Sequence, residues 1–320
     1  TTPTGPSDIA QSPPAATPVT DPHGRAGRNL AQAISVGVGL GAMILLSLFL
    51  AKDSFAVIIA VAMIVGVWEL VRALAVKQII VPIVPVAVGA AGMIYAAHQR
   101  GPEPLVVAFG LTCTAVAVWR VIDPRPGSGR DIAGGVFTAF YPCLLGGFAA
   151  MMLAADDGRS RIITFILVTV CSDIGGYVAG VLFGKHPMAP KISPKKSWEG
   201  FAGSVLFCAI AGSACIAFLF DKPWWIGVPL GALVAMCATI GDLMESVIKR
   251  DLGIKDMSNL LPGHGGMMDR LDSLLVCAPV VWAVLHYLVE HDRDDKPAPG
   301  QLILAAPRRG KPPRHLADLD

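Results

Sequence analysis

Long apolar runs separated by short polar breaks make up the central part of the chain. A helix needs about 20 residues to cross the hydrocarbon of a bilayer. Charged residues with Pro or Gly mark most breaks, as at Arg100-Gly101-Pro102 and Asp221-Lys222-Pro223. We therefore predict an all-α polytopic membrane protein of about nine transmembrane helices, at 30–50, 54–75, 79–97, 104–122, 132–154, 161–184, 201–220, 224–242 and 273–290.

Both ends of the chain lack such runs. Residues 1–28 and 292–320 are polar and rich in Pro, which predicts disordered tails because little apolar surface can offset the entropy of ordering them. The first apolar run begins only near Leu30 and is long enough to span, which argues against a signal peptide. Between the tails we distinguish helices 1–4 (29–130) from helices 5–9 (131–291).

Composition supports a membrane protein and narrows its partners. Apolar residues make up 53% of the chain and charged residues 16%, against roughly 25% charged in soluble proteins. A net charge of +2 gives no global field for nucleic acid, so no nucleic-acid partner is expected. The seven cysteines all lie in apolar runs without a C-x-x-C pair, which favours small buried side chains over a zinc site.

The positions of Lys and Arg predict the orientation. With the N-terminus inside, fifteen of them fall in inner segments and five in outer loops, so the positive-inside rule favours a cytoplasmic N-terminus. The other six lie in the C-terminal stretch, which nine spans would place outside, against the rule. In this orientation the two long polar segments, 184–200 and 241–272, both face the cytoplasm.

The second polar segment carries a dense set of charged residues. Asp242, Glu245 and Lys249 fall on one face of a helix that continues out of the eighth span. Gly253 is expected to end or bend this helix, and a Gly-rich turn at 262–266 precedes the ninth helix. Asp269 then lies in the first turn of that helix, with Asp272 on the same face.

This arrangement is typical of phosphate chemistry. A Gly-rich turn that opens a helix lets backbone N–H groups approach phosphate oxygens, and carboxylates from two helix ends can hold Mg²⁺. Nearby basic side chains would neutralise phosphate charge. Alternatively, the helix face is an exposed set of ion pairs and Asp269 only complements a helix N-terminus. His264 stays ambiguous, because a His in a Gly turn can simply bond to backbone.

One continuous stretch resembles the signature of the phosphatidate cytidylyltransferases, the bacterial-type CDP-diacylglycerol synthases. The matching pattern is Ser246-x-Ile248-Lys249-Arg250-x4-Lys255-Asp256-x-Ser258-x2-Leu261-Pro262-x-His264-Gly265-Gly266-Met267-x-Asp269-Arg270-Leu271-Asp272. Two further elements are similar to that family, namely Ser193-Pro194-Lys195-Lys196-Ser197-Trp198-Glu199-Gly200 and Ser172-Asp173-Ile174-Gly175-Gly176-Tyr177. The likeness covers roughly residues 130–290, which makes 131–291 the expected catalytic region, with the signature at 246–272.

The resemblance implies a metal-dependent nucleotidyltransferase that converts CTP and phosphatidic acid to CDP-diacylglycerol and pyrophosphate. It further implies a polar cavity open to the cytoplasm and to lipid, a place in the bacterial inner membrane, and often a homodimer. The implied metal ligands are Asp242 and Asp269, for Mg²⁺ and a second ion for which K⁺ is an alternative. The implied catalytic residues are Asp242, Asp269, Lys249, Arg270 and His264. The implied substrate-binding residues are Ser193, Lys195, Lys196, Ser197, Glu199, Asp173, Arg250, Lys255, Asp256, Gly265, Gly266 and Asp272.

The two further elements can also be interpreted from their residues alone. Ser193-Pro194 looks like an N-cap with Pro at the first helical position, which would put Lys195 at the start of the seventh helix, a place suited to a triphosphate. The alternative is a positive-inside anchor. Asp173 lies deep in its span, where a carboxylate needs a wet cavity or a partner, and the glycines after it equally fit a tight helix crossing.

Two other functions are less consistent with the sequence. A transporter could use Asp173 and Glu69 as intramembrane carboxylates, but the chain shows no internal repeat and its polar residues gather at one surface. We expect Glu69 and Arg72 to form an internal pair near a helix end. A CDP-alcohol phosphatidyltransferase would need a D-G-x2-A-R pattern with paired downstream aspartates, which the sequence lacks.

Overall fold

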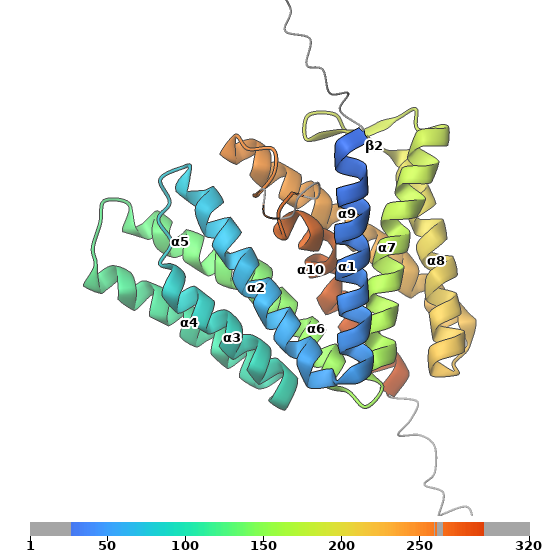
Figure 1. Cartoon of the computed structure of the whole chain (residues 1–320), viewed down its shortest axis with the longest axis horizontal. Coiled ribbons are helices and arrows are strands. Elements are labelled where there is room, and N and C mark those ends of the chain that lie inside the picture. The colour runs from blue at the N-terminus through green and yellow to red at the C-terminus, as the bar shows by residue number, and fades with distance from the viewer. Residues whose placement is uncertain (1–26, 259, 261–264, 291–320) are drawn as a thin grey trace, which may run out of the picture.

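The computed structural model describes residues 27–258, 260 and 265–290 (Figure 1). The predicted tails therefore lie outside the described residues, except that the first helix begins at Gly27. His264 also lies outside them.

Helices form most of the described chain. They are α1 (Gly27–Leu50), α2 (Lys52–Ala75), α3 (Ile83–Arg100), α4 (Pro102–Ile122), α5 (Ser128–Thr138), α6 (Leu145–Ala154), α7 (Gly158–Phe183), α8 (Trp198–Phe220), α9 (Gly227–Leu252) and α10 (Met268–Val284). A 3-10 turn, η2 (Trp224–Ile226), precedes α9, and a π-helical turn, η3 (Leu285–Glu290), follows α10. Another π-helical turn, η1 (Ala139–Leu144), joins α5 to α6 and contains Pro142, which has no N–H for the helical ladder.

Within the described residues, six helical segments are long and apolar enough to cross a membrane. They are Lys52–Ala75, Pro102–Ile122, Ser128–Ala154, Gly158–Phe183, Trp198–Phe220 and Trp224–Leu252. The other three expected spans coincide with α1, α3 and α10, which are helical but fall outside these six. The structure thus supports a helical membrane protein.

A β-hairpin interrupts the helical pattern, so the prediction of an all-α fold is wrong in this place. Strands β1 (Pro187–Ala189) and β2 (Ser193–Ser197) pair antiparallel between α7 and α8. The predicted N-cap at Ser193 is wrong too, because Ser197 is in extended conformation and its Oγ accepts the Gly200 N–H at 3.1 Å. Lys195 and Lys196 consequently lie on a strand.

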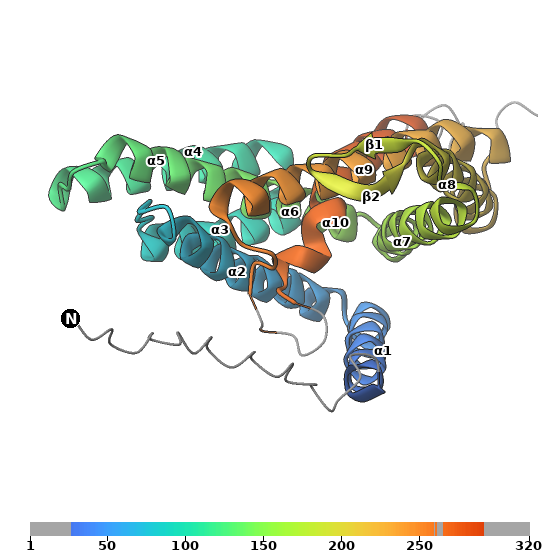
Figure 2. The same ribbon diagram turned by 90° about the horizontal axis from the view of Figure 1, so that it is seen from above.

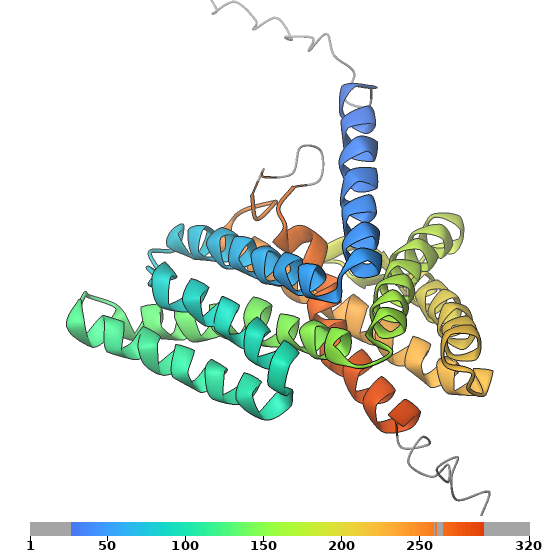
Figure 3. The same ribbon diagram turned by 60° about the horizontal axis from the view of Figure 1, so that its bottom comes forward.

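The helices form two groups with α10 between them. Figure 2 shows α2 to α6 on one side and α7 and α8 on the other, with α9 running from α8 toward the first side. Helix α10 packs on α9 and α7 of one group and on α6 and α2 of the other. Helix α1 projects from the bundle (Figure 3), and its C-terminal part contacts α2 and α7, where Arg159 Nε donates to the Leu48 carbonyl at 3.2 Å. The first turn of α10 therefore lies where both groups can reach it.

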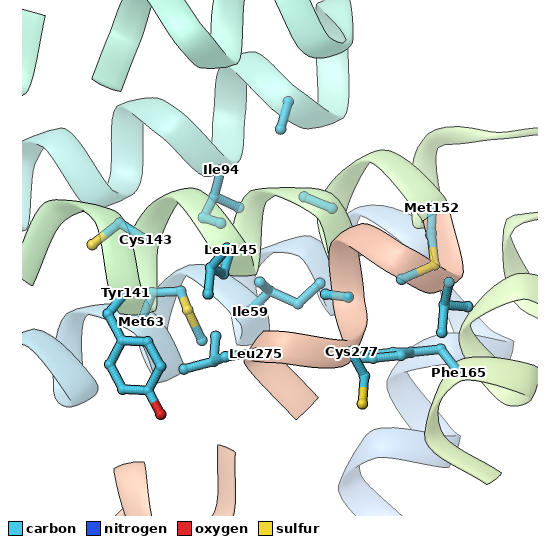
Figure 4. Packing of buried hydrophobic residues seen from close by; sticks show 14 of the residues in the cluster. Ile59, Met63, Ile94, Tyr141, Cys143, Leu145, Met152, Phe165, Leu275 and Cys277 are labelled. Atoms are coloured by element: carbon cyan, nitrogen blue, oxygen red, sulfur yellow. The ribbon is translucent and has the colours of Figure 1, made fainter. Parts of the chain in front are cut away.

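Apolar side chains from both groups meet around α10. Leu275 and Cys277 of α10 are buried with Met63 of α2 and Phe165 of α7 (Figure 4). A separate buried ion pair stabilises the N-terminal group, where Arg120 Nε lies 3.2 Å from Asp131 Oδ2. The Asp131 Oδ1 atom also accepts the Ile80 N–H at 2.7 Å, which ties α5 to the segment before α3.

Helices α7 and α8 cross closely, which was one of the alternatives left open for the glycines of α7. A Cβ atom built on Gly175 would lie 2.6 Å from the Gly203 carbonyl oxygen, so a side chain there would force the helices apart. The Ser204 hydroxyl donates to the Ser172 carbonyl at 2.7 Å across the same crossing. This contact fixes Asp173, the next residue of α7, beside the start of α8.

Candidate active site

Two adjoining polar cavities contain most of the predicted site residues. The first, which we call the hairpin cavity, has a volume of about 310 Å³ and lies between α7, the β-hairpin, α8 and α9. The site residues predicted from the sequence that line this cavity are Asp173, Ser193, Lys195, Lys196, Ser197 and Asp242. The hairpin therefore brings the Ser-Pro-Lys-Lys element to the carboxylates of α7 and α9, although not as a helix N-terminus.

The second cavity, which we call the signature cavity, has a volume of about 460 Å³. Asp173, Lys196 and Asp242 line it as well, so the two cavities share a wall. The remaining predicted residues that line it come from the signature, and they are Lys249, Asp256, Asp269, Arg270 and Asp272. Residues some 100 positions apart in the sequence thus converge on one polar region.

Asp242 is held by side chains from two directions. Lys196 Nζ of the hairpin donates to its Oδ2, and Ser273 Oγ of α10 donates to its Oδ1. Its side chain is 27% exposed, so solvent and ligands can reach it. The pairing of Lys196 with Asp242 brings the two polar segments into contact.

Asp269 is held mainly by backbone. Its Oδ2 accepts the Gly266 N–H at 2.7 Å and the Met257 N–H at 3.0 Å, while Lys249 Nζ donates to Oδ1 at 2.9 Å. Burial would raise the pKa of this carboxyl, but the Lys249 and Gly266 hydrogen bonds outweigh burial and lower the pKa. Asp269 precedes the expected span 273–290 and lies in the first turn of α10, as predicted.

The predicted charged face of α9 forms a connected set of contacts. Lys249 Nζ lies 2.5 Å from Glu245 Oε2 and bridges this carboxylate to Asp269 on α10. Among the described residues, the other Glu245 oxygen is buried without a hydrogen-bond partner. Glu245 also lines the signature cavity, so the ion pair belongs to the site rather than to a solvated helix face.

Some predicted substrate-binding residues lie away from both cavities. Glu199 accepts the His186 and Lys185 N–H groups at 3.2 Å each, and thereby braces the hairpin. Arg250 and Lys255 are exposed at and beyond the end of α9. Gly266 is close to the site, but its N–H is bonded to Asp269. The roles assigned to these residues stay predictions.

Sequence reasoning missed two residues that contact the site. Ser273, which binds Asp242, directly follows the signature and looked like an ordinary residue of the ninth span. Glu69 does not pair with Arg72. It accepts the Met267 and Met268 N–H groups, whereas Arg72 lies over the Trp68 ring. The predicted Glu69–Arg72 pair is therefore wrong. A carboxylate inside an apolar span does, however, indicate a specific partner.

The donor set fits a hard divalent cation in its chemistry. Asp173, Asp242, Asp269 and Asp272 all line the signature cavity, and Mg²⁺ prefers carboxylate oxygens together with water and substrate phosphates. Within the described residues, no three acidic, His or Cys side chains converge tightly enough to hold an ion by themselves. Asp242 and Asp269 are each neutralised by a lysine, so an ion bound there would replace a lysine contact.

Comparisons with known proteins agree with the signature. The sequence profile of the cytidylyltransferase family matches residues 31–288. The phosphatidate cytidylyltransferase of Mycobacterium bovis is 41% identical over 278 residues, which cover 82% of this chain and 90% of that protein. The protein of the same name from Mycobacterium leprae is 39% identical over 280 residues, with 82% and 90% covered, and that from Helicobacter pylori is 39% identical over 148 residues, with 46% and 55% covered. The chain therefore belongs to the cytidylyltransferase family.

Proposed function

We propose that the chain is a membrane enzyme that transfers the cytidylyl group of CTP to phosphatidic acid. The observation that supports this most is the convergence of Lys196 on Asp242, because it joins the basic hairpin to the acidic end of α9 in one cavity. Relatives that are 39% and 41% identical over 82% of this chain carry the name phosphatidate cytidylyltransferase. The transporter alternative gains no support, since the polar residues gather in these two cavities.

The reaction needs little acid–base help. A phosphate oxygen of phosphatidic acid attacks the α-phosphorus of CTP, a new P–O bond forms, and the bond from the α-phosphorus to its bridging oxygen breaks. Pyrophosphate leaves with that oxygen. The second pKa of a phosphate monoester is about 6, so the nucleophile is already largely ionised at neutral pH. The protein's task is then alignment and charge neutralisation.

The hairpin cavity is the proposed place for the triphosphate. Lys195 and Lys196 supply positive charge there, and Ser193 and Ser197 supply hydroxyl groups. Lys249 and Arg270 would neutralise charge from the signature side. Asp242 and Asp269 are the proposed ligands of Mg²⁺, which would polarise the phosphate oxygens when bound. The identity of a second ion belongs to the same proposal.

An apolar cavity beside the site is suited to an acyl chain of the lipid. It has a volume of about 150 Å³, and its lining is apolar. Met267, Leu271 and Leu274 line it together with apolar residues of α1, α2, α6 and α7. Leu274 also lines the signature cavity, so an amphiphilic lipid can place its phosphate on one side of α10 and a chain on the other.

We further propose the membrane arrangement that the charges favour. Nine spans, with α1, α3 and residues 273–290 of α10 and η3 added to the six apolar segments, would cross the bacterial inner membrane with the N-terminus and both polar cavities on the cytoplasmic side. CTP would then reach the hairpin from the cytoplasm. A homodimer would be compatible with this arrangement.

Labelled CTP tests the reaction directly. Purified protein is given phosphatidic acid, Mg²⁺ and CTP labelled at either the α- or the γ-phosphate. The α-label should move into the organic phase as CDP-lipid, and the γ-label should stay in water as pyrophosphate. Diacylglycerol, which lacks the phosphate nucleophile, is the control and should take up no label. Entry of the γ-label into lipid, or no transfer of the α-label, would overturn the proposal.

A further inference from the structure

Glu69 lies in the N-terminal group of helices, far in sequence from the signature, yet its side chain reaches the signature. The residue is in α2 and is fully buried. Its three hydrogen-bond donors in the described part of the chain are all uncharged. Burying a carboxylate costs free energy unless such donors bind it, so a carboxylate at this apolar position indicates a specific structural or functional role.

The three donors belong to the two sides of one loop. Ser258 Oγ donates to Glu69 Oε1 at 2.5 Å, and the Met267 N–H donates to the same oxygen at 2.9 Å. The Met268 N–H donates to Oε2 at 2.8 Å. A single side chain of α2 therefore ties the segment after α9 to the first residues of α10.

Close packing accompanies these hydrogen bonds. A Cβ atom on Gly266 would lie 2.9 Å from both carboxylate oxygens of Glu69, so a larger residue would push the carboxylate away. On α2, Gly66 lies three residues before Glu69, and a Cβ atom there would lie 2.9 Å from Met268 Sδ. Two glycines thus let α2 and the start of α10 approach each other at the level of Glu69.

The anchored turn is the part of α10 that carries site residues. Asp269 and Arg270 directly follow the two N–H groups that Glu69 accepts, and Asp272 and Ser273 come one turn later. The N–H groups at a helix start need an outside acceptor, and a carboxylate there is favoured by the helix dipole. Any shift of this turn would move Asp269 and Arg270 together.

We propose that Glu69 is a positioning residue for the nucleotidyl transfer. By holding Ser258, Met267 and Met268 it fixes the first turn of α10 so that Asp269 and Arg270 face the signature cavity. This role rests on the proposed function, and it assigns to the N-terminal helices a direct part in the geometry of the site. Glu69 lines neither the hairpin cavity nor the signature cavity, so we assign it no contact with the substrates.

Glu69→Gln tests this role, because it keeps the shape but turns an NH₂ group toward backbone N–H groups. We expect kcat per folded molecule to fall about 100-fold, as misplacement of catalytic groups by about 1 Å does. Hydrogen exchange in residues 265–270 should become faster, while exchange in α3 and α4 should not change. Asp131→Asn is the matched control, since Asp131 is also a buried carboxylate of the N-terminal group that accepts a backbone N–H.

The control should lower thermal stability but change kcat per folded molecule less than threefold. If Glu69→Gln loses activity only in proportion to its folded fraction, or if its exchange at 265–270 matches wild type, the proposal is overturned. Faster exchange with kcat within threefold of wild type overturns it as well. Exchange does not depend on turnover, so a wild-type protein that makes no CDP-lipid would contradict the proposed function while the anchoring is still measured.

Ser258→Ala provides a milder variant should Glu69→Gln fail to fold. It removes one of the three donors and leaves the carboxylate in place. We expect about a fivefold loss of kcat with faster exchange at 265–270, the size expected for one net hydrogen bond. Wild-type exchange and wild-type kcat in this variant would contradict the role of Glu69.

Discussion

The two aspartates with the same predicted task lie in different surroundings. Asp242 projects from α9 into both polar cavities and is held by the side chains of Lys196 and Ser273. Asp269 is only 7% exposed, and two backbone N–H groups and Lys249 occupy its oxygens. Asp242 is therefore available for a ligand, whereas Asp269 also holds the protein together.

The difference shows how one residue can serve chemistry and folding at once. The N–H groups of Met257 and Gly266 come from the two sides of the signature loop, and Asp269 joins them much as Glu69 joins Ser258 and Met267. Loss of Asp269 would leave these buried donors unsatisfied, which is costly. Loss of Asp242 would leave Lys196, which is partly exposed and can turn to water, and Ser273, whose hydroxyl has Asp272 Oδ1 as another acceptor at 3.5 Å.

The largest expected effect separates the two aspartates. Asp242→Asn and Asp269→Asn should each lower kcat on the order of 10³-fold, about 4 kcal/mol of transition-state stabilisation, if both hold the metal. Only Asp269→Asn should also lower the free energy of unfolding, by about 2 kcal/mol, since its amide replaces an acceptor with a donor. Turnover with α-labelled CTP and thermal unfolding in the same detergent measure both effects.

Either of two results would break this comparison. Near-normal turnover in both variants would remove the metal assignment. Equal stability losses would show that the backbone hydrogen bonds of Asp269 add no more to folding than the side-chain contacts of Asp242.

Apolar run lengths and the signature pattern predicted a large part of the fold and the site. Each of the six apolar segments in the structure coincides with a predicted span, because a run of about 20 apolar residues has few alternatives to a helix. Asp269 in the first turn of α10 and Lys249 on the face of Glu245 followed from helical spacing alone.

The rest depended on long-range contacts that local patterns do not contain. Ser193 and Ser197 are both good N-cap residues four positions apart, and only pairing with β1 selects Ser197. Glu69 and Arg72 have the spacing of a helical ion pair, but the buried N–H groups of Met267 and Met268 compete more strongly for the carboxylate. Ser273 becomes part of the site only once α9 and α10 are packed together.

The lysines that neutralise the two aspartates provide the next test. Lys249 lies between Glu245 and Asp269, whose side chains are 2% and 7% exposed, so Lys249→Met should lower the free energy of unfolding by about 3 kcal/mol. Lys196 and Asp242 are each more exposed, and Lys196→Met should cost at most about 1 kcal/mol. Denaturant or thermal unfolding of both variants checks this contrast, and an equal cost for the two would contradict the difference in burial.

The smallest effect concerns two glycines that both have a positive φ. Gly253 (φ 74°) and Gly265 (φ 80°) both lie in the left-handed region, where an L-residue costs about 1 kcal/mol, so each change to Ala should lower stability by that amount. A Cβ atom on Gly253 meets nothing within 4 Å, whereas one on Gly265 lies 3.0 Å from Asp269 Oδ2. We therefore expect Gly265→Ala to reduce kcat about tenfold by displacing the carboxylate, as small misplacements do, and Gly253→Ala to leave it unchanged. Equal turnover in the two variants would show that the position of the Asp269 carboxylate does not affect the reaction. Asp242 would then be the aspartate on which catalysis depends.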